Sequence, residues 1–222
     1  MKTSTAIAIL IGILIIGGFA YFQMSNITEK ISEVRETSET VKKIATSAEE
    51  NMKTTMSERF DIERVEGIAE NNMLKYLLIR VKPGVGAKYL DLRKARLTVD
   101  VGNLKEPATY VPAMGKTSAC DAEVFKLMKE IGTYDWTTFV KAVTKNLDPT
   151  KFTVVWDNCD DKDDIYTLSD GQTAYVIYPL PEPVPSSTYI TIDLYVSDGW
   201  SNPMKIRVPE NMDKGFVLIY PA

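Results

Sequence analysis

The sequence predicts an α+β protein in which a long hydrophobic N-terminal helix (residues 1–66) precedes an antiparallel, Ig-like β-sandwich head (residues 67–222). The head is expected to carry a small helical insertion at about residues 112–148. Three observations support this prediction. The N-terminal region joins a charge-free apolar block to a charged continuation, with no Gly or Pro between Ala20 and Glu66. Short segments of alternating hydrophobicity follow, separated by turn residues as in antiparallel sheets. Two short segments of helical periodicity lie among them.

The first part of the predicted helix, residues 3–22, is as apolar as a membrane span. It has no charge from Ala6 to Phe22 and, together with Thr3–Thr5, is just long enough to cross a hydrocarbon layer of roughly 30 Å. A cleaved secretory signal peptide is the competing interpretation. Such a peptide ends at a small-residue cleavage site before the mature domain. Here the helical pattern simply continues, which favours a membrane-held or polymerising helix.

The second part, residues 23–66, has the pattern of an amphipathic rod. Apolar or small residues recur at alternating steps of four and three, as in an a/d seam. They are Ile27, Ile31, Val34, Ser38, Val41, Ala45, Ala48 and Met52. At 1.5 Å per residue, a rod on the order of 70 Å is available. Such a weak seam suits packing among many copies of the same helix. A juxtamembrane stalk that folds back on its own head is the alternative.

The head is predicted to consist mainly of strands. Ile79 and Val81 alternate inward with Arg80 and Lys82 outward before a Pro-Gly turn. Strands are expected at residues 72–82, 95–103, 153–157, 173–178, 189–196, 205–209 and 217–220. Short strands at this spacing are typical of a two-sheet sandwich or partial barrel.

Two helices and a proline-rich segment complete the predicted head. Helices are expected at residues 122–131 and 136–145, with Asp135 as the N-cap of the second. They look inserted into the sheet rather than central to it. The segment Pro179–Pro185 contains four prolines and is expected to be a semi-extended connector or a sheet-edge crossing.

The composition argues against catalysis and nucleic-acid binding. The chain contains no His, which is the commonest general base and zinc ligand. Its formal net charge is −4, and no basic cluster with interleaved aromatic residues is present. We find no glycine-rich phosphate loop, nucleophile elbow or Cys-x-x-Cys pair. We therefore expect neither an enzyme nor a nucleic-acid-binding protein, and no organic cofactor.

The two cysteines are expected to pair. Cys120 precedes the first predicted helix, and Cys159 follows a predicted strand. Two cysteines in an exported β-domain are more often paired than free. A disulfide would tie the helical insertion to the sheet, although two buried free thiols are the alternative.

An acidic segment next to Cys159 raises the question of a metal site. Its candidate ligands are Asp157, Asn158, Asp160, Asp161, Asp163 and Asp164. Ca²⁺ binds six to eight oxygens of this kind, but the spacing lacks the central Gly and the distal Glu of an EF-hand. A solvated acidic loop is the favoured interpretation, and a Ca²⁺ site is the alternative.

Asn26-Ile27-Thr28 forms an N-glycosylation sequon, and Asn26 is therefore a candidate acceptor. Its position on the helix just after the apolar block argues against its use. In a filament this position would be buried in the core.

Several segments resemble archaellin, the archaeal flagellin. They are the apolar N-terminal helix, the segment Ile79–Val99 and the closing segment Met204–Pro221. In that family a strand ends in a Pro/Gly turn, an Ile/Leu-Asp-Leu step follows, and a further strand resumes. Gly84–Leu92 matches this pattern position by position, with Leu90-Asp91-Leu92 as its most specific part. The resemblance covers the two ends of the chain and leaves the middle unmatched.

The resemblance implies a structural, non-enzymatic subunit of the archaellum filament, which serves swimming motility. In this family the N-terminal helix is inserted in the cytoplasmic membrane before assembly. It is then buried with its copies in the core of an extracellular cell-surface filament, while the β-domains tile the outside. The implied partners are further copies of this chain, with a second archaellin as an open alternative. The residues expected in the polymerisation core are Ile7, Ile9, Leu10, Ile11, Ile13, Leu14, Ile15, Ile16, Phe19 and Phe22.

One departure from the family pattern keeps related functions open. Archaellin and archaeal pilin precursors carry a short basic leader that is cut before the apolar helix, whereas Met1-Lys2 alone precedes Thr3 here. An unprocessed protein would favour a membrane-anchored, archaellin-like stator accessory protein. An archaeal type IV pilin or adhesion subunit is the other alternative.

Overall fold

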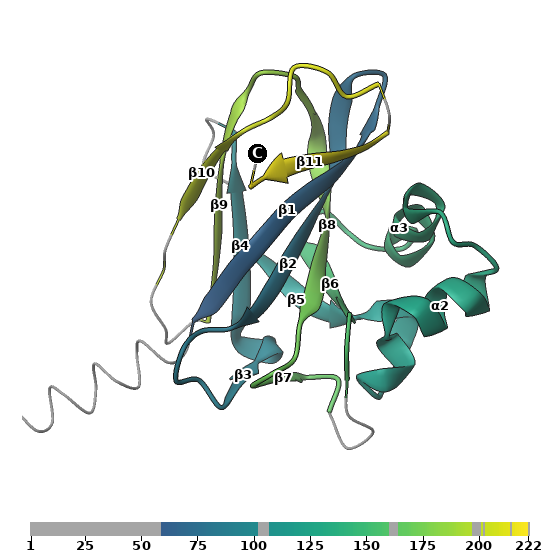
Figure 1. Cartoon of the computed structure of the whole chain (residues 1–222), viewed down its shortest axis with the longest axis vertical. Coiled ribbons are helices and arrows are strands. Elements are labelled where there is room, and N and C mark those ends of the chain that lie inside the picture. Colours follow the sequence, from purple (N-terminus) through teal and green to yellow (C-terminus); the bar gives the residue numbers. More distant parts are fainter. Residues whose placement is uncertain are drawn as a thin grey trace, which may run out of the picture. The chain divides into compact units, whose positions relative to one another are not determined.

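A nine-stranded sheet forms the body of the head in the computed structural model (Figure 1). The structure describes residues 59–101, 107–159, 164–196, 201, 203–213 and 215–221. The strands of this sheet follow the order β10 (Met204–Arg207), β9 (Tyr189–Val196), β4 (Ala95–Asp100), β5 (Ala108–Pro112), β6 (Lys151–Trp156), β8 (Ala174–Pro185), β2 (Met73–Pro83), β1 (Phe60–Glu70) and β11 (Phe216–Tyr220). A second sheet pairs β3 (Tyr89–Asp91) with β7 (Thr167–Ser169).

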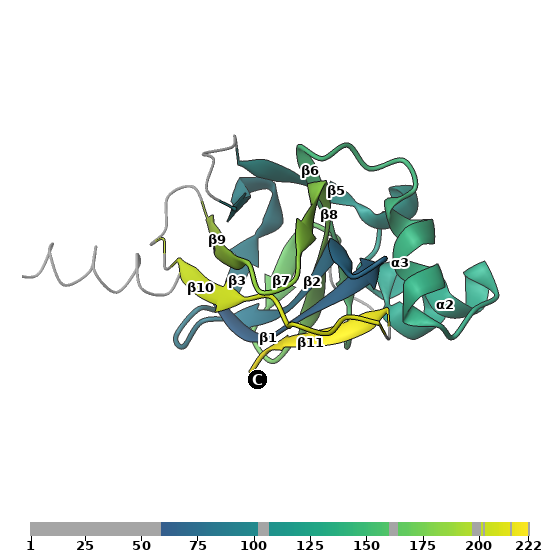
Figure 2. The same cartoon turned by 90° about the horizontal axis from the view of Figure 1, so that it is seen from above.

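The large sheet folds back on itself around the hydrophobic core (Figure 2). Arg59, just before β1, forms a bridge with Tyr195 in β9, although β1 and β9 are far apart in the strand order. Leu77, Val176 and Ile192, from different parts of the sheet, are all fully buried. The predicted strand-rich head is therefore confirmed. Of the two predicted arrangements, the two-sheet sandwich is corrected, because one continuous sheet supplies both sides of the core, and this is nearer to the partial barrel that was the alternative.

Strand β1 corrects the predicted end of the N-terminal helix. Residues 60–66 were expected to belong to the rod, but they lie in β1 and pair with β2. The register shifts between Ile62 and Arg64 and again between Ile68 and Ala69. These irregularities break the two-residue alternation that identifies a strand. Asn71 and Asn72, both with positive φ, form the two-residue turn to β2.

The two helices connect neighbouring parallel strands. β5 and β6 run parallel, with Tyr110 opposite Phe152. Parallel strands cannot be joined by a tight turn and need a crossover of a dozen or more residues. That crossover contains α2 (Val124–Ile131) and α3 (Trp136–Thr144). The sheet is therefore mixed, and the segment expected as an insertion into an antiparallel sheet is a crossover connection.

The other strands agree with the sequence to different degrees. All seven expected strands are present, with shifted ends, as β2, β4, β6, β8, β9, β10 and β11. Besides β1, the strands that were not expected are β3, β5 and β7. The proline-rich segment is the second half of β8 and pairs with β2. Its register jumps between Leu74 and Tyr76, so that Pro179 lies opposite Tyr76 and Val184 lies opposite Leu74.

Several predictions fall outside the described residues. They are the apolar segment 3–22, the rod up to residue 58, every residue of the expected polymerisation core, and Asn26. Within the described part of the chain, no helix is long and apolar enough to span a membrane.

Candidate functional site

The crossover helices cover one face of the sheet near β8 and β11, and Trp136 lies at the contact (Figure 1). Its ring centroid is 5.1 Å from that of Tyr175 in β8 and 6.1 Å from that of Phe216 in β11. α3 begins at this point because the Asp135 carboxylate accepts a hydrogen bond from the backbone N–H of Thr138 at 2.7 Å. This confirms the predicted N-cap. The cap therefore places Trp136 on the sheet.

Glu70, at the end of β1, links the β1–β2 hairpin to α3. Its carboxylate pairs with Lys141 of α3 and accepts a hydrogen bond from Lys75 Nζ at 2.5 Å. The hydrogen bonds from Lys141 and Lys75 lower the pKa of Glu70 to about 2. Glu70 is therefore ionised in all but strongly acidic solution, and it bridges two cations from different elements.

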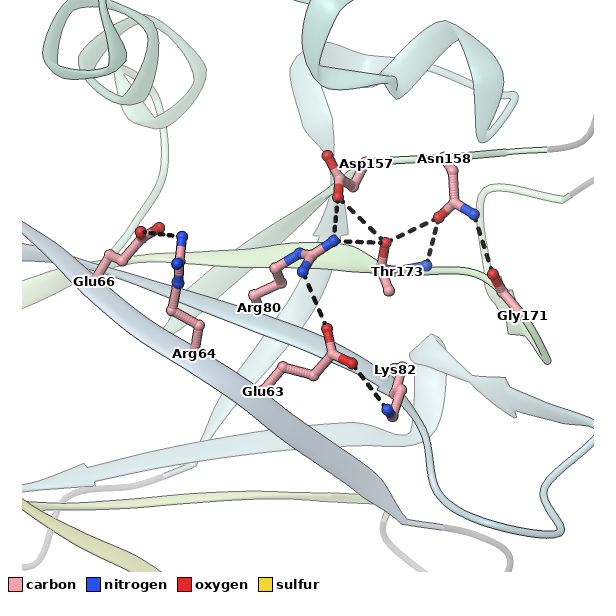
Figure 3. Close-up of polar contacts among 9 residues, drawn as sticks. All are labelled: Glu63, Arg64, Glu66, Arg80, Lys82, Asp157, Asn158, Gly171 and Thr173. Atoms are coloured by element: carbon pink, nitrogen blue, oxygen red, sulfur yellow. Dashed lines mark hydrogen bonds and ion pairs between the residues drawn. The ribbon is translucent and has the colours of Figure 1, made fainter. Parts of the chain in front are cut away.

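Arg80 is the centre of a charged cluster beside the crossover, formed by Glu63, Arg80, Lys82 and Asp157 (Figure 3). Its guanidinium lies 3.2 Å from Glu63 Oε2 through Nη1 and 2.6 Å from Asp157 Oδ2 through Nη2. Lys82 Nζ lies 2.8 Å from the other oxygen of Glu63. The hydrogen bond to Asp157 raises the pKa of Arg80. The cluster therefore joins β1 and β2 to the end of β6.

Asn158 and Thr173 extend this cluster to the turn before β8 (Figure 3). The Asn158 side chain accepts a hydrogen bond from the backbone N–H of Thr173 at 2.6 Å and donates one to the carbonyl of Gly171 at 3.0 Å. Thr173 Oγ1 lies 3.3 Å from Asp157 Oδ2. Asp157 Oδ2 and Asn158 Oδ1 thus already take part in contacts within the protein.

The remaining candidate metal ligands are divided between described and undescribed residues. Asp164 accepts a hydrogen bond from the backbone N–H of Tyr166 at 3.2 Å. Asp160, Asp161 and Asp163 lie outside the described residues. Across the described ranges, no group of three or more Asp, Glu, Cys or His residues is placed to hold a metal ion. A Ca²⁺ site that depends on the whole acidic segment stays a prediction.

Glu66 of β1 is buried and pairs with Arg64 (Figure 3). It is 5% exposed, and burial raises its pKa, while Arg64 Nη1 at 3.2 Å acts in the opposite direction. Burial also raises the pKa of Tyr175, and the negative charges of Asp157 and Glu66 add to this effect. Tyr175 is thus in contact with Trp136 and also close enough to Asp157 for that charge to raise its pKa.

A disulfide joins the start of the crossover to the segment after β6. Cys120 and Cys159 are bonded, with their Cα atoms 5.4 Å apart. Two isolated bridges lie nearby and join Ser118 to Asp164 and Glu123 to Trp156. The structure thus pairs the two cysteines that the sequence suggested, and the oxidation of this pair in the cell stays a prediction. The arrangement holds the start of the crossover against the end of β6.

Sequence reasoning found parts of this site. It placed Arg80 and Lys82 on the outer face of a strand, identified Asp135 as a cap, and paired the cysteines. It missed Glu63 and Glu66, since they lie in the part of β1 that was expected to be helical, and Glu70, which lies between that part and the first expected strand. Together the Trp136 contact, the Glu70–Lys141 ion pair and the disulfide fix the crossover to the sheet, and the Arg80 ion pairs join neighbouring strands.

Comparison with known proteins identifies a similar fold. No family model and no curated protein matches the chain. Among solved structures, the archaeal flagellin FlaB1 from Methanocaldococcus jannaschii matches with a TM-score of 0.55 and 14% sequence identity, covering 72% of this chain and 95% of that one. The archaeal flagellum of Methanospirillum hungatei strain JF1 matches over 99% of both chains, with a TM-score of 0.44 and 13% identity. The archaellum periplasmic stator protein FlaG from Sulfolobus acidocaldarius covers 67% of this chain and 98% of its own, with a TM-score of 0.39 and 13% identity.

Of these three matches, only that to flagellin FlaB1 has a TM-score above 0.5, and we base the comparison on it. At 14% identity it establishes a likeness of fold. The resemblance to archaellin that the sequence suggested is therefore confirmed at the level of the fold.

Proposed function

We propose that this chain is a structural subunit of the archaellum filament, that it polymerises through its N-terminal helix, and that it serves swimming motility. Two features together support this proposal: the head has an archaellin-like fold, and a charge-free apolar block at residues 6–22 precedes it. Neither feature alone suffices, because β-rich heads and apolar helices both occur in unrelated proteins.

The physical argument concerns the apolar block. A helix without charges is stable in a bilayer, and outside it must find equally apolar neighbours. A bundle of identical helices provides such neighbours, so the same segment suits a membrane stage and a filament core. In this proposal the chain is held in the cytoplasmic membrane before assembly, and the assembled filament lies on the cell surface. The head then lies outside the core and has no catalytic role.

The contacts that hold the crossover against the sheet support this proposal. A filament that transmits torque loads its outer domains laterally. The Trp136–Tyr175 contact and the Glu70–Lys141 ion pair tie α3 to the sheet, and the Cys120–Cys159 bond ties the start of the crossover to the segment after β6. Such a head resists local opening better than one whose crossover is held at its ends alone.

The test uses filaments sheared from cells that express the full chain. Electron microscopy and mass spectrometry of the sheared material are expected to show filaments that contain this chain. Ile13→Glu is expected to abolish them, because a charge within the apolar core is strongly unfavourable. The control Glu29→Gln, outside the apolar block, is expected to leave them intact.

Three results would count against the proposal. Filaments that form normally with Ile13→Glu would exclude polymerisation through the apolar helix. A chain that stays in the membrane fraction while filaments lack it would instead favour a stator accessory protein. Filaments that do contain the chain but confer adhesion without swimming would favour a pilin or adhesion subunit.

A further inference from the structure

Strands β4, β9 and β10 have an outer face that no helix of the described chain covers (Figure 2). Side chains alternate cleanly along β9, since Ile190, Ile192 and Leu194 are buried while the residues between them are not. We call this surface the β9 face. It consists of Arg96, Thr98, Tyr189, Thr191, Asp193, Tyr195, Lys205 and Arg207, which strand pairing brings side by side.

The chemistry of the β9 face is that of a contact surface. Tyr189 is 59% exposed, and Lys205 Nζ lies 5.1 Å from the centre of its ring. Arg96 Nη1 is held by the carbonyls of Arg93 and Ala95 at 3.1 and 2.8 Å, so its guanidinium is fixed on the surface. Tyrosine and arginine are the residues most enriched at the centres of protein interfaces. Fixed side chains of this kind lose little entropy on docking.

The crossover exposes a second surface of complementary chemistry. α2 buries Val124, Leu127 and Met128 against the core, whereas Phe125 on the same helix is 64% exposed. Tyr134, in the connection to α3, is 78% exposed. We call Phe125 and Tyr134 the aromatic flank. Figures 1 and 2 both place α2 and α3 on one side of the head and β9 and β10 on the other.

We propose that the aromatic flank of one head docks on the β9 face of the next copy in the filament. This inference rests on the proposed function and deepens it by naming the contact between neighbouring heads. A polar helical filament requires heterologous contacts, in which two different surfaces of the same chain meet. Two surfaces on opposite sides of one head meet this requirement, and a self-complementary surface does not.

The side chains on the two surfaces suit one another. An exposed aromatic ring gains from a cation over its face, and Arg96 and Lys205 supply two such cations. Phe125 offers a large apolar side chain that is costly to leave in water. The partner is therefore a second copy of this chain.

The test is cross-linking within assembled filaments of the full chain. The double variants Phe125→Cys/Tyr189→Cys and Phe125→Cys/Thr98→Cys place one thiol on each surface. With a short bismaleimide linker, they are expected to give a ladder of covalent oligomers, since each copy is joined to two neighbours. Each single-cysteine variant is expected to give no ladder. The matched control Phe125→Cys/Val85→Cys, with Val85 85% exposed outside both surfaces, is expected to give none.

A second measurement tests the energetics. Phe125→Ser is expected to raise the critical concentration for assembly about tenfold, as the loss of an interface anchor does. Val85→Ser, at a position that is even more exposed than Phe125, is expected to leave it within about twofold. Filaments that form without a ladder from either double variant overturn the proposed contact. Dimers from the single variants overturn it as well, because they indicate a self-complementary contact. If the unmodified chain forms no filaments, the proposed function fails together with it.

Discussion

Removing the disulfide is expected to destabilise the head substantially. The Cys120–Cys159 bond closes a loop with a sequence separation of 39 residues that contains both crossover helices. The chain-entropy relation for a closed loop of this length gives about 4 kcal/mol at 25 °C. Native domains have a total free energy of unfolding of about 5–15 kcal/mol, so this is a large share. The variant Cys120→Ala/Cys159→Ala should therefore remain folded but with a greatly reduced margin.

Urea unfolding followed by tryptophan fluorescence measures this loss. All three tryptophans, Trp136, Trp156 and Trp200, lie in the head, so the signal reports on this part even in the full chain in detergent. Trp156 is fully buried. We expect the midpoint to fall and Tm to drop by about 8–16 °C. Reduction of the unmodified chain should produce the same change.

The opposite outcome is equally clear. A loss below about 1 kcal/mol in both the double variant and the reduced chain would show that the ion pairs and the Trp136 contact alone hold the crossover. The reasoning from loop entropy would then be refuted. A loss in the double variant without one in the reduced chain would point to poor packing of the substituted alanines.

Four further predictions concern a glycine in β1, the ion pairs of Arg80 and Glu70, and the acidic segment at residues 157–164. Gly67→Ala should cost about 1–3 kcal/mol in unfolding free energy, since a Cβ there would lie 2.2 Å from Leu74 Cδ1 and 3.1 Å from the Tyr76 carbonyl; an unchanged urea midpoint would show that Leu74 moves aside freely. Arg80→Leu should cost about 1–2 kcal/mol because it leaves Glu63 and Asp157 without their shared cation, whereas Lys82→Leu should cost less, and equal losses in the two variants would contradict this. Because the pKa of Glu70 is lowered from its ordinary value of 4.5 to about 2 in the folded head, its stabilising effect is present above pH 4.5 and is lost as the pH falls toward 2; Glu70→Gln should remove this part of the acid dependence of Tm, and parallel Tm–pH curves for the two proteins would count against it. For a solvated acidic loop, EDTA and added Ca²⁺ should leave Tm unchanged, and a rise in Tm with Ca²⁺ would support the metal site at residues 157–164 instead.

Local patterns predicted much of the head correctly. The alternation along β4 and β9 marked these strands, because one face of each is buried and the other is not. In β2 the alternation holds from Ile79 to Lys82, although Leu78 on the opposite face is buried as well. Asp135 was identifiable as a cap because the residue types at helix starts follow from unsatisfied backbone N–H groups. Strand β1 was missed since its register shifts disrupt the same alternation.

The ion pairs around Arg80 could not be predicted from the sequence, because they join residues that are far apart along the chain. Arg80 and Asp157 are 77 positions apart, and only the neighbouring positions of β2, β8 and β6 in the sheet bring them together. The parallel pairing of β5 with β6 was equally hidden, because a strand carries no local mark of its partner's direction.

Three features could be predicted from neighbouring residues alone: the alternating strands, the capped helix, and the apolar N-terminal block that suggested a filament. Three other features depend on the fold as a whole. The strands form one folded-back sheet, the helices connect parallel strands, and Arg80 pairs with both Glu63 and Asp157. The physical reason is that burial and capping act within a few residues and leave a periodic trace. Strand order and ion pairing instead depend on which distant segments share the core, and that choice is made by the packing of the whole head.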